Sequence, residues 1–289
     1  MECSIVAVVG AGTMGHGIAQ IAAVAGCSVT LIDETRTLAQ RGMDRIRENL
    51  EGAVARGKID AATRDSALAR IAVSDDLAAG AASAHLVIEA VPERPDLKAA
   101  IFRTLDTAVA DATILASNTS SLSITELQRA TARPGRVLGL HFFNPVHINR
   151  LVEVVRGADT RDDVVEASLA FVRRAGKEPV VVRDSPGFAT SRLGVLLGLE
   201  AMRMVEEGVA SAEDIDKAME LGYRHPMGPL RLTDLVGLDV RLDIARYLHA
   251  KLGSEAFRPP AILERMVAQG LLGRKTGRGF YTWTEGDGS

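Results

Sequence analysis

The feature that most constrains this chain is a glycine-rich segment near its N-terminus, Gly10-Ala11-Gly12-Thr13-Met14-Gly15. An apolar, β-branched run precedes it, and an apolar stretch with helical character follows it. In a G-x-G-x-x-G turn between a strand and a helix, the first glycine permits the tight turn and the second lets the backbone approach a pyrophosphate. The third lets the helix pack closely on the strand, and the helix N-terminus offers N–H groups to the phosphates. The segment therefore predicts a Rossmann-type dinucleotide-binding unit.

The acidic residue that such a unit requires is also present. Asp33 ends the next apolar run, 18 residues after Gly15 (33 − 15), where a carboxylate accepts hydrogen bonds from an adenosine ribose. Its charge would repel a 2′-phosphate, which favours NAD over NADP. Arg36 is the competing residue, because an arginine near this point can hold that phosphate. We expect the cofactor to be NAD.

Short apolar runs alternate with amphipathic stretches through the first 183 residues, which predicts a mostly parallel sheet covered on both faces. The charged segment Thr35–Ile71 has helical periodicity with a break at Gly57-Lys58, and we expect it to be an inserted helical hairpin. The expected fold class is α/β, a Rossmann-type doubly wound sheet with this hairpin. The expected strands are Ser4–Val9, Ser28–Asp33, Leu86–Ala90, Thr113–Ser117, Arg136–Phe142, Leu151–Val155 and Pro179–Val182.

The character of the chain changes at Asp184-Ser185-Pro186-Gly187, after which no segment is typical of a strand. We therefore expect two domains, 1–183 for the cofactor and an all-helical 184–289 for substrate and dimerisation. Serine, threonine and aspartate are favoured as helix caps, and proline suits a first turn. The expected helix starts are Asp184 or Ser185 with Pro186, Ser211 with Asp214 in a capping box, and Thr233 or Asp234.

Composition excludes several classes of protein. A net charge of −3 gives no basic surface for nucleic acid, and no apolar run approaches the ~20 residues that a membrane span requires. The N-terminus lacks the basic region of a secretory signal, so we expect a cytoplasmic protein. Cys3 and Cys27 are expected to be buried thiols rather than a disulfide, and no cluster has metal-ligand spacing.

Polar residues follow two of the later expected strands, at the ends where open α/β sheets bind ligands. His141 is a plausible general base for a hydroxyl group, because imidazole titrates near neutral pH. Glu153 can accept the other ring N–H and stabilise the imidazolium, as in a catalytic triad. A purely structural role for His141 is an equally acceptable interpretation of the pattern alone.

Several motifs in order along the chain resemble those of the 3-hydroxyacyl-CoA dehydrogenases, and among these the bacterial 3-hydroxybutyryl-CoA dehydrogenases are the most similar. The resemblance covers essentially the whole chain. It is carried by Gly10–Gly15 with Met14, Glu89-Ala90-Val91-Pro92-Glu93, Ser117–Ser121, His141–Pro145, Asp184–Phe188, His225–Pro229 and Gly273–Gly277.

The resemblance implies roles for individual residues. His141 would remove the 3-hydroxyl proton with Glu153 as its partner, and Ser120 would hydrogen-bond the substrate oxygen. Ser191 stands where much of the family has a catalytic-site asparagine, so its role in polarising the substrate is the least well supported. The implied cofactor contacts are Gly10, Gly12, Thr13, Met14, Gly15, Asp33, Ala90, Glu93, Lys98, Ser120, Asn144 and Lys275, and the implied coenzyme A contacts are Asn49, Arg56 and Ser120.

Together these observations predict an NAD-dependent dehydrogenase acting on a short-chain 3-hydroxyacyl-CoA, with no metal. One alternative is another β-hydroxyacid dehydrogenase, but those use a lysine base, which the His141 and Glu153 pair disfavours. The other is a structural relative without activity, since a lens crystallin resembles this family. The apolar helix expected at Leu193–Met204 spreads leucines around more than one face. A helix of that kind needs burial on several sides, so we expect a homodimer built through the helical domain.

Overall fold

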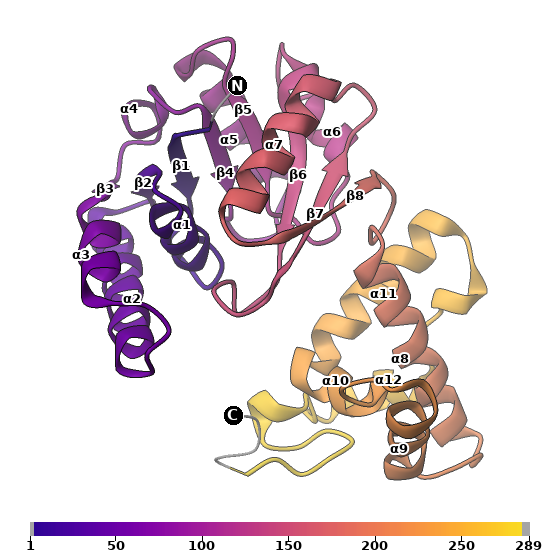
Figure 1. The fold of residues 1–289 in the computed structure, drawn as a ribbon. Helices are drawn as coiled ribbons and strands as arrows, with labels where there is room; N and C mark the ends of the chain where they lie inside the picture. The colour runs from indigo at the N-terminus through magenta and orange to yellow at the C-terminus, as the bar shows by residue number, and fades with distance from the viewer. Residues whose placement is uncertain (1–2, 285–289) are drawn as a thin grey trace. The chain divides into compact units, whose positions relative to one another are not determined.

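The computed structural model describes residues 3–284 of the 289-residue chain. The chain divides into two compact units, Met1–Ser185 and Pro186–Ser289. The first is an α/β unit and the second is helical (Figure 1). Each unit has a hydrophobic core of its own.

The first unit is built on one eight-stranded sheet in the order β3-β2-β1-β4-β5-β6-β7-β8. Every neighbouring pair is parallel except β6 and β7, which are antiparallel. The order reverses between β1 and β4, which is the point where doubly wound sheets bind ligands. The strands are β1 (Ile5–Val9), β2 (Ser28–Ile32), β3 (Ile71–Ser74), β4 (Leu86–Glu89), β5 (Ile114–Ser117), β6 (Val137–Phe142), β7 (Leu151–Arg156) and β8 (Glu178–Arg183).

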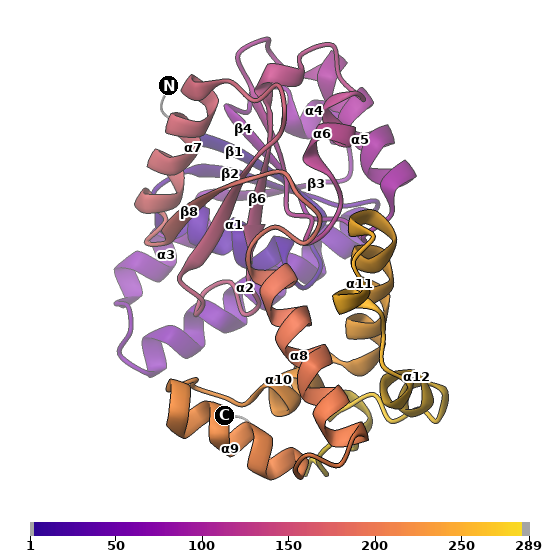
Figure 2. The ribbon, with the colours of Figure 1, turned by 90° about the vertical axis from the view of Figure 1, so that its right-hand side faces the viewer.

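Helices cover both faces of this sheet, with α1 and α7 on one face and α4, α5 and α6 on the other (Figure 2). The α2 and α3 helices form the inserted hairpin, which lies side by side with α1. The helices are α1 (Gly15–Val24), α2 (Arg36–Ala55), α3 (Ala61–Ala69), α4 (Leu77–Ala81), α5 (Pro95–Ala108), α6 (Ile124–Gln128) and α7 (Asp162–Arg174), with a 3-10 turn η1 (Pro134–Arg136).

The expected strands and the hairpin are confirmed to within a residue or so at their ends, but one strand was missed. The β3 strand, Ile71–Ser74, comes directly after the hairpin and pairs with β2 at the sheet edge. It is short and only partly buried, and the segment expected to form the hairpin extends to its first residue, Ile71. The two cysteines, Cys3 and Cys27, are buried thiols that are not joined by a disulfide, as expected.

The second unit consists of helices, and among its described residues only isolated bridges join extended segments. Its core lies between α8, α10, α11 and α12. None of the described helices is both long and apolar enough to cross a membrane. The helices are α8 (Thr190–Glu206), α9 (Ala212–Tyr223), α10 (Pro229–Val236), α11 (Leu238–Leu252) and α12 (Ala261–Ala268), with 3-10 turns η2 (Glu255–Phe257) and η3 (Arg274–Thr276).

Two of the expected helix starts are wrong. Asp184 does not cap α8, which begins only at Thr190; its carboxylate instead accepts hydrogen bonds from Ser123 Oγ and Thr125 N at the start of α6. Asp234 lies inside α10, fully buried, and accepts from the backbone of the C-terminal segment and from Trp283 Nε1. In both cases the carboxylate accepts from donors far away in the sequence instead of capping its own helix, and the buried Asp234 carboxylate in particular requires such partners. The cap at Ser211 is confirmed.

Candidate active site

The glycine-rich turn has the geometry that a bound pyrophosphate needs. Gly10 adopts φ +96°, and a Cβ at Gly15 would lie 1.6 Å from the Gly10 carbonyl oxygen, so neither position accepts a side chain. A Cβ at Gly12 would meet nothing within 4 Å. The chain itself therefore does not require glycine at residue 12, whereas a ligand lying against the backbone does. These residues fit a dinucleotide.

Asp33 lies where the adenosine half of that ligand belongs. Its carboxylate accepts hydrogen bonds from Ala11 N and Glu34 N, both at 2.7 Å, which ties the end of β2 to the glycine turn. A cavity of about 360 Å³ opens beside it, and Asp33, Glu34 and Asp75 supply its carboxylates. Arg36 is not among the described residues that line this cavity, although Arg94 is. Three acidic side chains disfavour a 2′-phosphate there and favour NAD.

His141 and Glu153 form a buried pair at the ligand-binding end of the sheet. The antiparallel register of β6 and β7 places the two residues directly opposite each other, where facing side chains meet. His141 Nδ1 and Glu153 Oε2 are 2.7 Å apart. The Phe143 ring packs on the imidazole with centroids 4.3 Å apart. The geometry fits an imidazole that is oriented by a carboxylate, as a general base requires.

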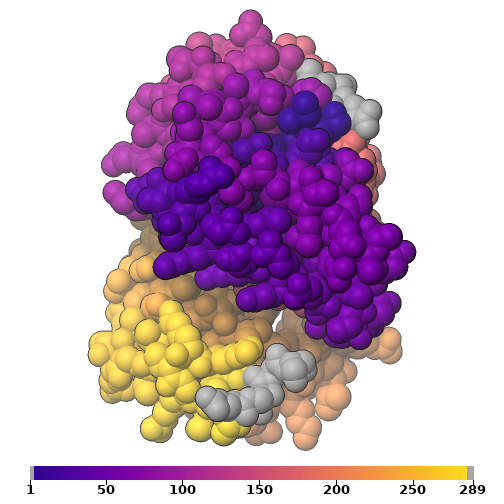
Figure 3. All heavy atoms as spheres, turned by 90° about the vertical axis from the view of Figure 1, so that its left-hand side faces the viewer, coloured from indigo at the N-terminus to yellow at the C-terminus, as the bar shows by residue number. Residues whose placement is uncertain are grey.

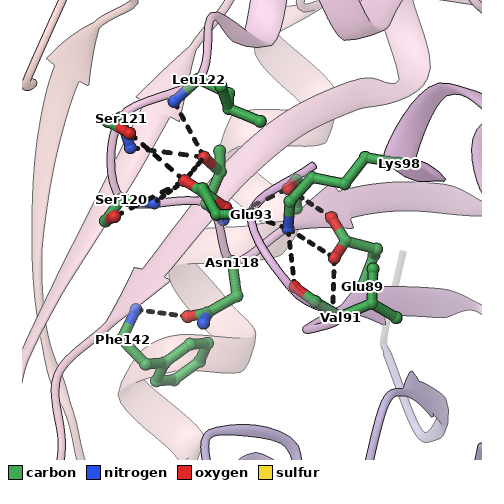
Figure 4. Close-up of polar contacts among 11 residues, drawn as sticks. Glu89, Val91, Glu93, Lys98, Asn118, Ser120, Ser121, Leu122 and Phe142 are labelled. Atoms are coloured by element: carbon green, nitrogen blue, oxygen red, sulfur yellow. Dashed lines mark hydrogen bonds and ion pairs between the residues drawn. The ribbon is translucent and has the colours of Figure 1, made fainter. Parts of the chain in front are cut away.

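The loop after β5 carries Ser120 and is held by Glu93 (Figure 4). One oxygen of the Glu93 carboxylate accepts from Thr119 Oγ1 and from Ser120 N, the latter at 3.0 Å. Burial by itself raises the pKa of Glu93, but the charge of Lys98 and these hydrogen bonds outweigh it and lower the pKa. Glu93 is therefore an anion that fixes the backbone of the loop. Asn118 Oδ1 accepts from Phe142 N at 2.9 Å and joins this loop to the end of β6.

Lys98 and Glu89 form an ion pair beneath this loop that sequence reasoning missed. Their side chains are 1% and 0% exposed, and Lys98 Nζ lies 2.6 Å from Glu89 Oε1. Lys98 also contacts Glu93 Oε2 at 3.2 Å (Figure 4). The resemblance implies that Lys98 touches the cofactor, and it gives Glu89 no role. No local pattern reveals the pair, because one partner ends a strand and the other lies in a helix.

Two of the three expected coenzyme A contacts, Asn49 and Arg56, belong to the hairpin helix α2 and its C-cap, and the hairpin forms part of the surface seen in Figure 3. The third, Ser120, lies in the loop after β5. Arg56 ends α2 and lines a cavity of about 660 Å³, whereas Asn49 hydrogen-bonds Gln20, which also lines the cavity. Four further basic residues line it, and no carboxylate does so among the described lining residues. They are Lys58, His147, Arg174 and Lys177. Its apolar and cationic lining fits a phosphorylated aromatic group.

His147 is a member of this cavity that the sequence alone could not place. Burial, followed by the nearby charges of His16, Lys177 and Arg56, lowers its pKa. A phosphate in the cavity would offset those charges.

Three more of the expected site residues come from the loop after β6, from α8 and from η3. Asn144 is exposed in the loop after β6, where its carbonyl oxygen accepts from Asn149 Nδ2 at 2.6 Å. Ser191 lies in the first turn of α8 and Lys275 in η3, both in the second unit. Lys275 Nζ binds the Asp239 carboxylate within that unit. The roles of these three residues stay predictions.

Comparison with known proteins agrees with the geometry. The model of the 3-hydroxyacyl-CoA dehydrogenase NAD-binding domain matches residues 5–185, and that of the C-terminal domain matches residues 187–283. A probable 3-hydroxybutyryl-CoA dehydrogenase of Bacillus subtilis is 44% identical, over 99% of both chains. A 3-hydroxybutyryl-CoA dehydrogenase of Mycobacterium tuberculosis is 46% identical, over 96% of this chain and 98% of its own.

A solved structure shows the same likeness in three dimensions. The (S)-3-hydroxybutyryl-CoA dehydrogenase of Ralstonia eutropha superposes with a TM-score of 0.95 at 42% identity, covering 98% of this chain and 100% of that one. The dinucleotide turn, the buried His141–Glu153 pair and the full-length matches lead to one conclusion. The chain belongs to the 3-hydroxyacyl-CoA dehydrogenase family.

Proposed function

We propose that this protein interconverts a short-chain (S)-3-hydroxyacyl-CoA and the matching 3-oxoacyl-CoA with NAD, and that its substrate pair is 3-hydroxybutyryl-CoA and acetoacetyl-CoA. The relatives named for that substrate match nearly the whole chain at 44% and 46% identity, which supports this choice. The observation that carries the proposal is the buried His141–Glu153 pair at the sheet end that also holds the dinucleotide turn.

The residues of the chain supply the proton transfer and the positioning. Glu153 holds His141 Nδ1, so the proton of the 3-hydroxyl goes to Nε2, and the carboxylate stabilises the imidazolium that forms. Ser120, held by Glu93, donates a hydrogen bond to the same substrate oxygen. A bound nicotinamide supplies the hydride acceptor for C3. In the second unit, Ser191 and Lys275 would contact substrate and cofactor respectively.

The test is NADH consumption with acetoacetyl-CoA, measured against a series of longer 3-oxoacyl-CoA thioesters. We expect turnover that is fastest with the short chains, and His141→Ala should lower kcat by about 10²–10⁴, which is the usual contribution of a positioned general base. Turnover of free 3-oxoacids but not of thioesters would favour another β-hydroxyacid dehydrogenase. Tight NADH binding without turnover of either class would favour a structural relative.

We propose that the cavity lined by Arg56, Lys58, His147, Arg174 and Lys177, called the basic cavity below, holds the adenosine end of coenzyme A. Arg56 presents a guanidinium that can bind a phosphate in bidentate fashion. Lys58 and His147 add further donors at the same wall, and the apolar residues beside them suit an adenine ring. Asn49 would support this site through Gln20. Arg56→Ala should raise KM for acetoacetyl-CoA about tenfold or more with little change in kcat, because the contact lies far from the reacting atoms.

We also propose a homodimer formed through the second unit. Leu193 on α8 is 61% exposed, and Leu197 on the same helix is 43% exposed. The neighbouring helices add exposed Leu235, Val236 and Val240. Exposed apolar side chains gathered on helices that pack together support an interaction site there, and a two-fold dimer is the commonest closed solution.

A cytoplasmic location is proposed as well. Cysteines that are not joined in disulfides, such as Cys3 and Cys27, are typical of reducing compartments.

A further inference from the structure

The ammonium group of Lys98 lies between two carboxylates and makes three contacts. It is 2.6 Å from Glu89 Oε1, 3.2 Å from Glu93 Oε2 and 3.1 Å from the Val91 carbonyl oxygen (Figure 4). An ammonium has three N–H donors, so the three acceptors match them. Its side chain is 1% exposed, so these three protein contacts set the position of the ammonium group.

Glu89 anchors this lysine to the sheet. Its second carboxylate oxygen accepts from Ser117 Oγ at 2.6 Å, and its first also accepts from Val91 N at 2.8 Å. Glu89 and Ser117 are register partners at the ends of β4 and β5. Ser117 Oγ in turn accepts from Thr119 N. The buried carboxylate therefore fixes the Lys98 ammonium relative to the strand that leads into the Ser120 loop.

Glu93 transmits this position to the loop. One carboxylate oxygen faces Lys98, and the other accepts from Thr119 Oγ1, Ser120 N and, at 3.4 Å, Ser121 Oγ. Without the cation, the like charges of Glu89 and Glu93 would repel each other. The loop would then lose the acceptor that holds Ser120.

We propose that Lys98 is a positioning residue: anchored by Glu89, it holds Glu93 against Thr119 and Ser120, and so fixes the Ser120 hydroxyl that meets the substrate oxygen. This inference rests on the dehydrogenase function proposed above. It assigns a role to Glu89 and adds an indirect action through Ser120 to the cofactor contact expected of Lys98.

The key variant removes both members of the buried pair. Lys98→Met alone leaves Glu89 unpaired, and breaking a buried pair in this way should lower the Tm by more than about 5 °C. In Lys98→Met/Glu89→Gln neither charge is left buried alone, so the Tm should return to within about 3 °C of wild type. Glu93 still lacks its cation in this double variant. Its kcat with acetoacetyl-CoA should therefore stay about 10- to 100-fold below wild type, the usual effect of a misplaced reacting group.

Two further measurements identify the route of the effect. In a Ser120→Ala background, the double substitution should lower kcat by less than about threefold more, since residues that act as a unit are non-additive. The kcat of each variant is measured at NADH concentrations well above its Kd for NADH, determined by fluorescence, so that a change in cofactor affinity does not enter kcat. The matched control is Arg64→Met/Asp65→Asn, which makes the same kinds of change in an exposed ion pair of α3 and should behave as wild type.

The proposal is overturned if the double variant regains wild-type kcat together with its Tm, which would make the pair purely structural. It is also overturned if the kcat losses multiply in the Ser120→Ala background. A kcat that returns to the wild-type value once NADH is saturating would leave Lys98 with a cofactor contact alone and would also overturn the proposal. A wild-type protein that does not turn over acetoacetyl-CoA would instead refute the proposed function itself.

Discussion

Replacement of Glu153 by glutamine tests whether the carboxylate charge drives proton transfer. In the unsubstituted protein, His141 Nδ1 lies 2.7 Å from the Glu153 carboxylate. The substitution keeps the side-chain length, and the amide oxygen of glutamine can still accept the hydrogen bond from Nδ1. The tautomer of the imidazole and its orientation are therefore retained. Only the electrostatic stabilisation of the imidazolium is lost.

The size of that loss follows from the geometry. With the nitrogen and oxygen 2.7 Å apart, the two charge centres are about 4 Å apart, and at an effective dielectric constant of ~20 their attraction is about 4 kcal/mol. Relaxation of the site reduces this figure, and each ~1.4 kcal/mol is a factor of ten in rate. We expect Glu153→Gln to lower kcat by about 10²–10³.

The assay is NADH consumption at saturating acetoacetyl-CoA, with the NADH Kd and the Tm of each variant measured in parallel. Glu153→Ala is the comparison variant, because it loses both charge and orientation, and it should be slower still. NADH binding should be unchanged, since the pair lies away from the glycine turn along the sheet order. A glutamine variant within about threefold of wild-type kcat would refute the electrostatic argument. An equal loss in NADH affinity would point to a folding role.

Three further predictions concern the cofactor, the substrate and the assembly. Asp33→Ala should weaken NADH binding about tenfold and narrow its advantage over NADPH, because a ribose acceptor and a repulsive charge disappear together; a wild type that prefers NADPH would contradict the cofactor assignment. A bound phosphate favours the protonated form of His147, whose pKa is lowered in the free protein. Calorimetry should therefore show that the Kd for coenzyme A decreases as the pH falls from about 7.5 towards 6, by at most about tenfold per pH unit. In His147→Asn the Kd should depend less on pH, because the titrating imidazole is gone. Light scattering should give twice the chain mass of 30.7 kDa for wild type and a monomer for Leu197→Glu, whereas a monomeric wild type would remove the dimer.

Features that depend on local pattern could be predicted from the sequence. The glycine turn and the acid that ends β2 follow from spacing along one βαβ unit, because strand, turn and helix each form from neighbouring residues. The hairpin of α2 and α3 follows from helical periodicity. Ser211 caps α9 as expected, because its hydroxyl reaches an amide only three residues away. His141 and Glu153 were expected as partners, and the resemblance to known dehydrogenases carried much of that expectation.

Features that depend on partners far apart in the chain could not be predicted in the same way. Asp184 and Asp234 have the composition of helix caps, yet each is taken up by distant donors. The basic cavity gathers residues from α1, α2 and the segments around His147 and Lys177, and no one of these stretches is unusual alone.

The sequence by itself therefore determined the fold class, the dinucleotide turn and the candidate base, since these rest on periodicity, backbone conformation and residue type within short segments. Only the tertiary structure decided which charges are buried together. Glu89 ends β4, which lies beside β5 in the sheet, and Lys98 belongs to α5. The two become an ion pair because the fold brings α5 against the end of β4. A buried charge must be paired, and which partner it finds depends on strand order and helix placement, which no local pattern encodes.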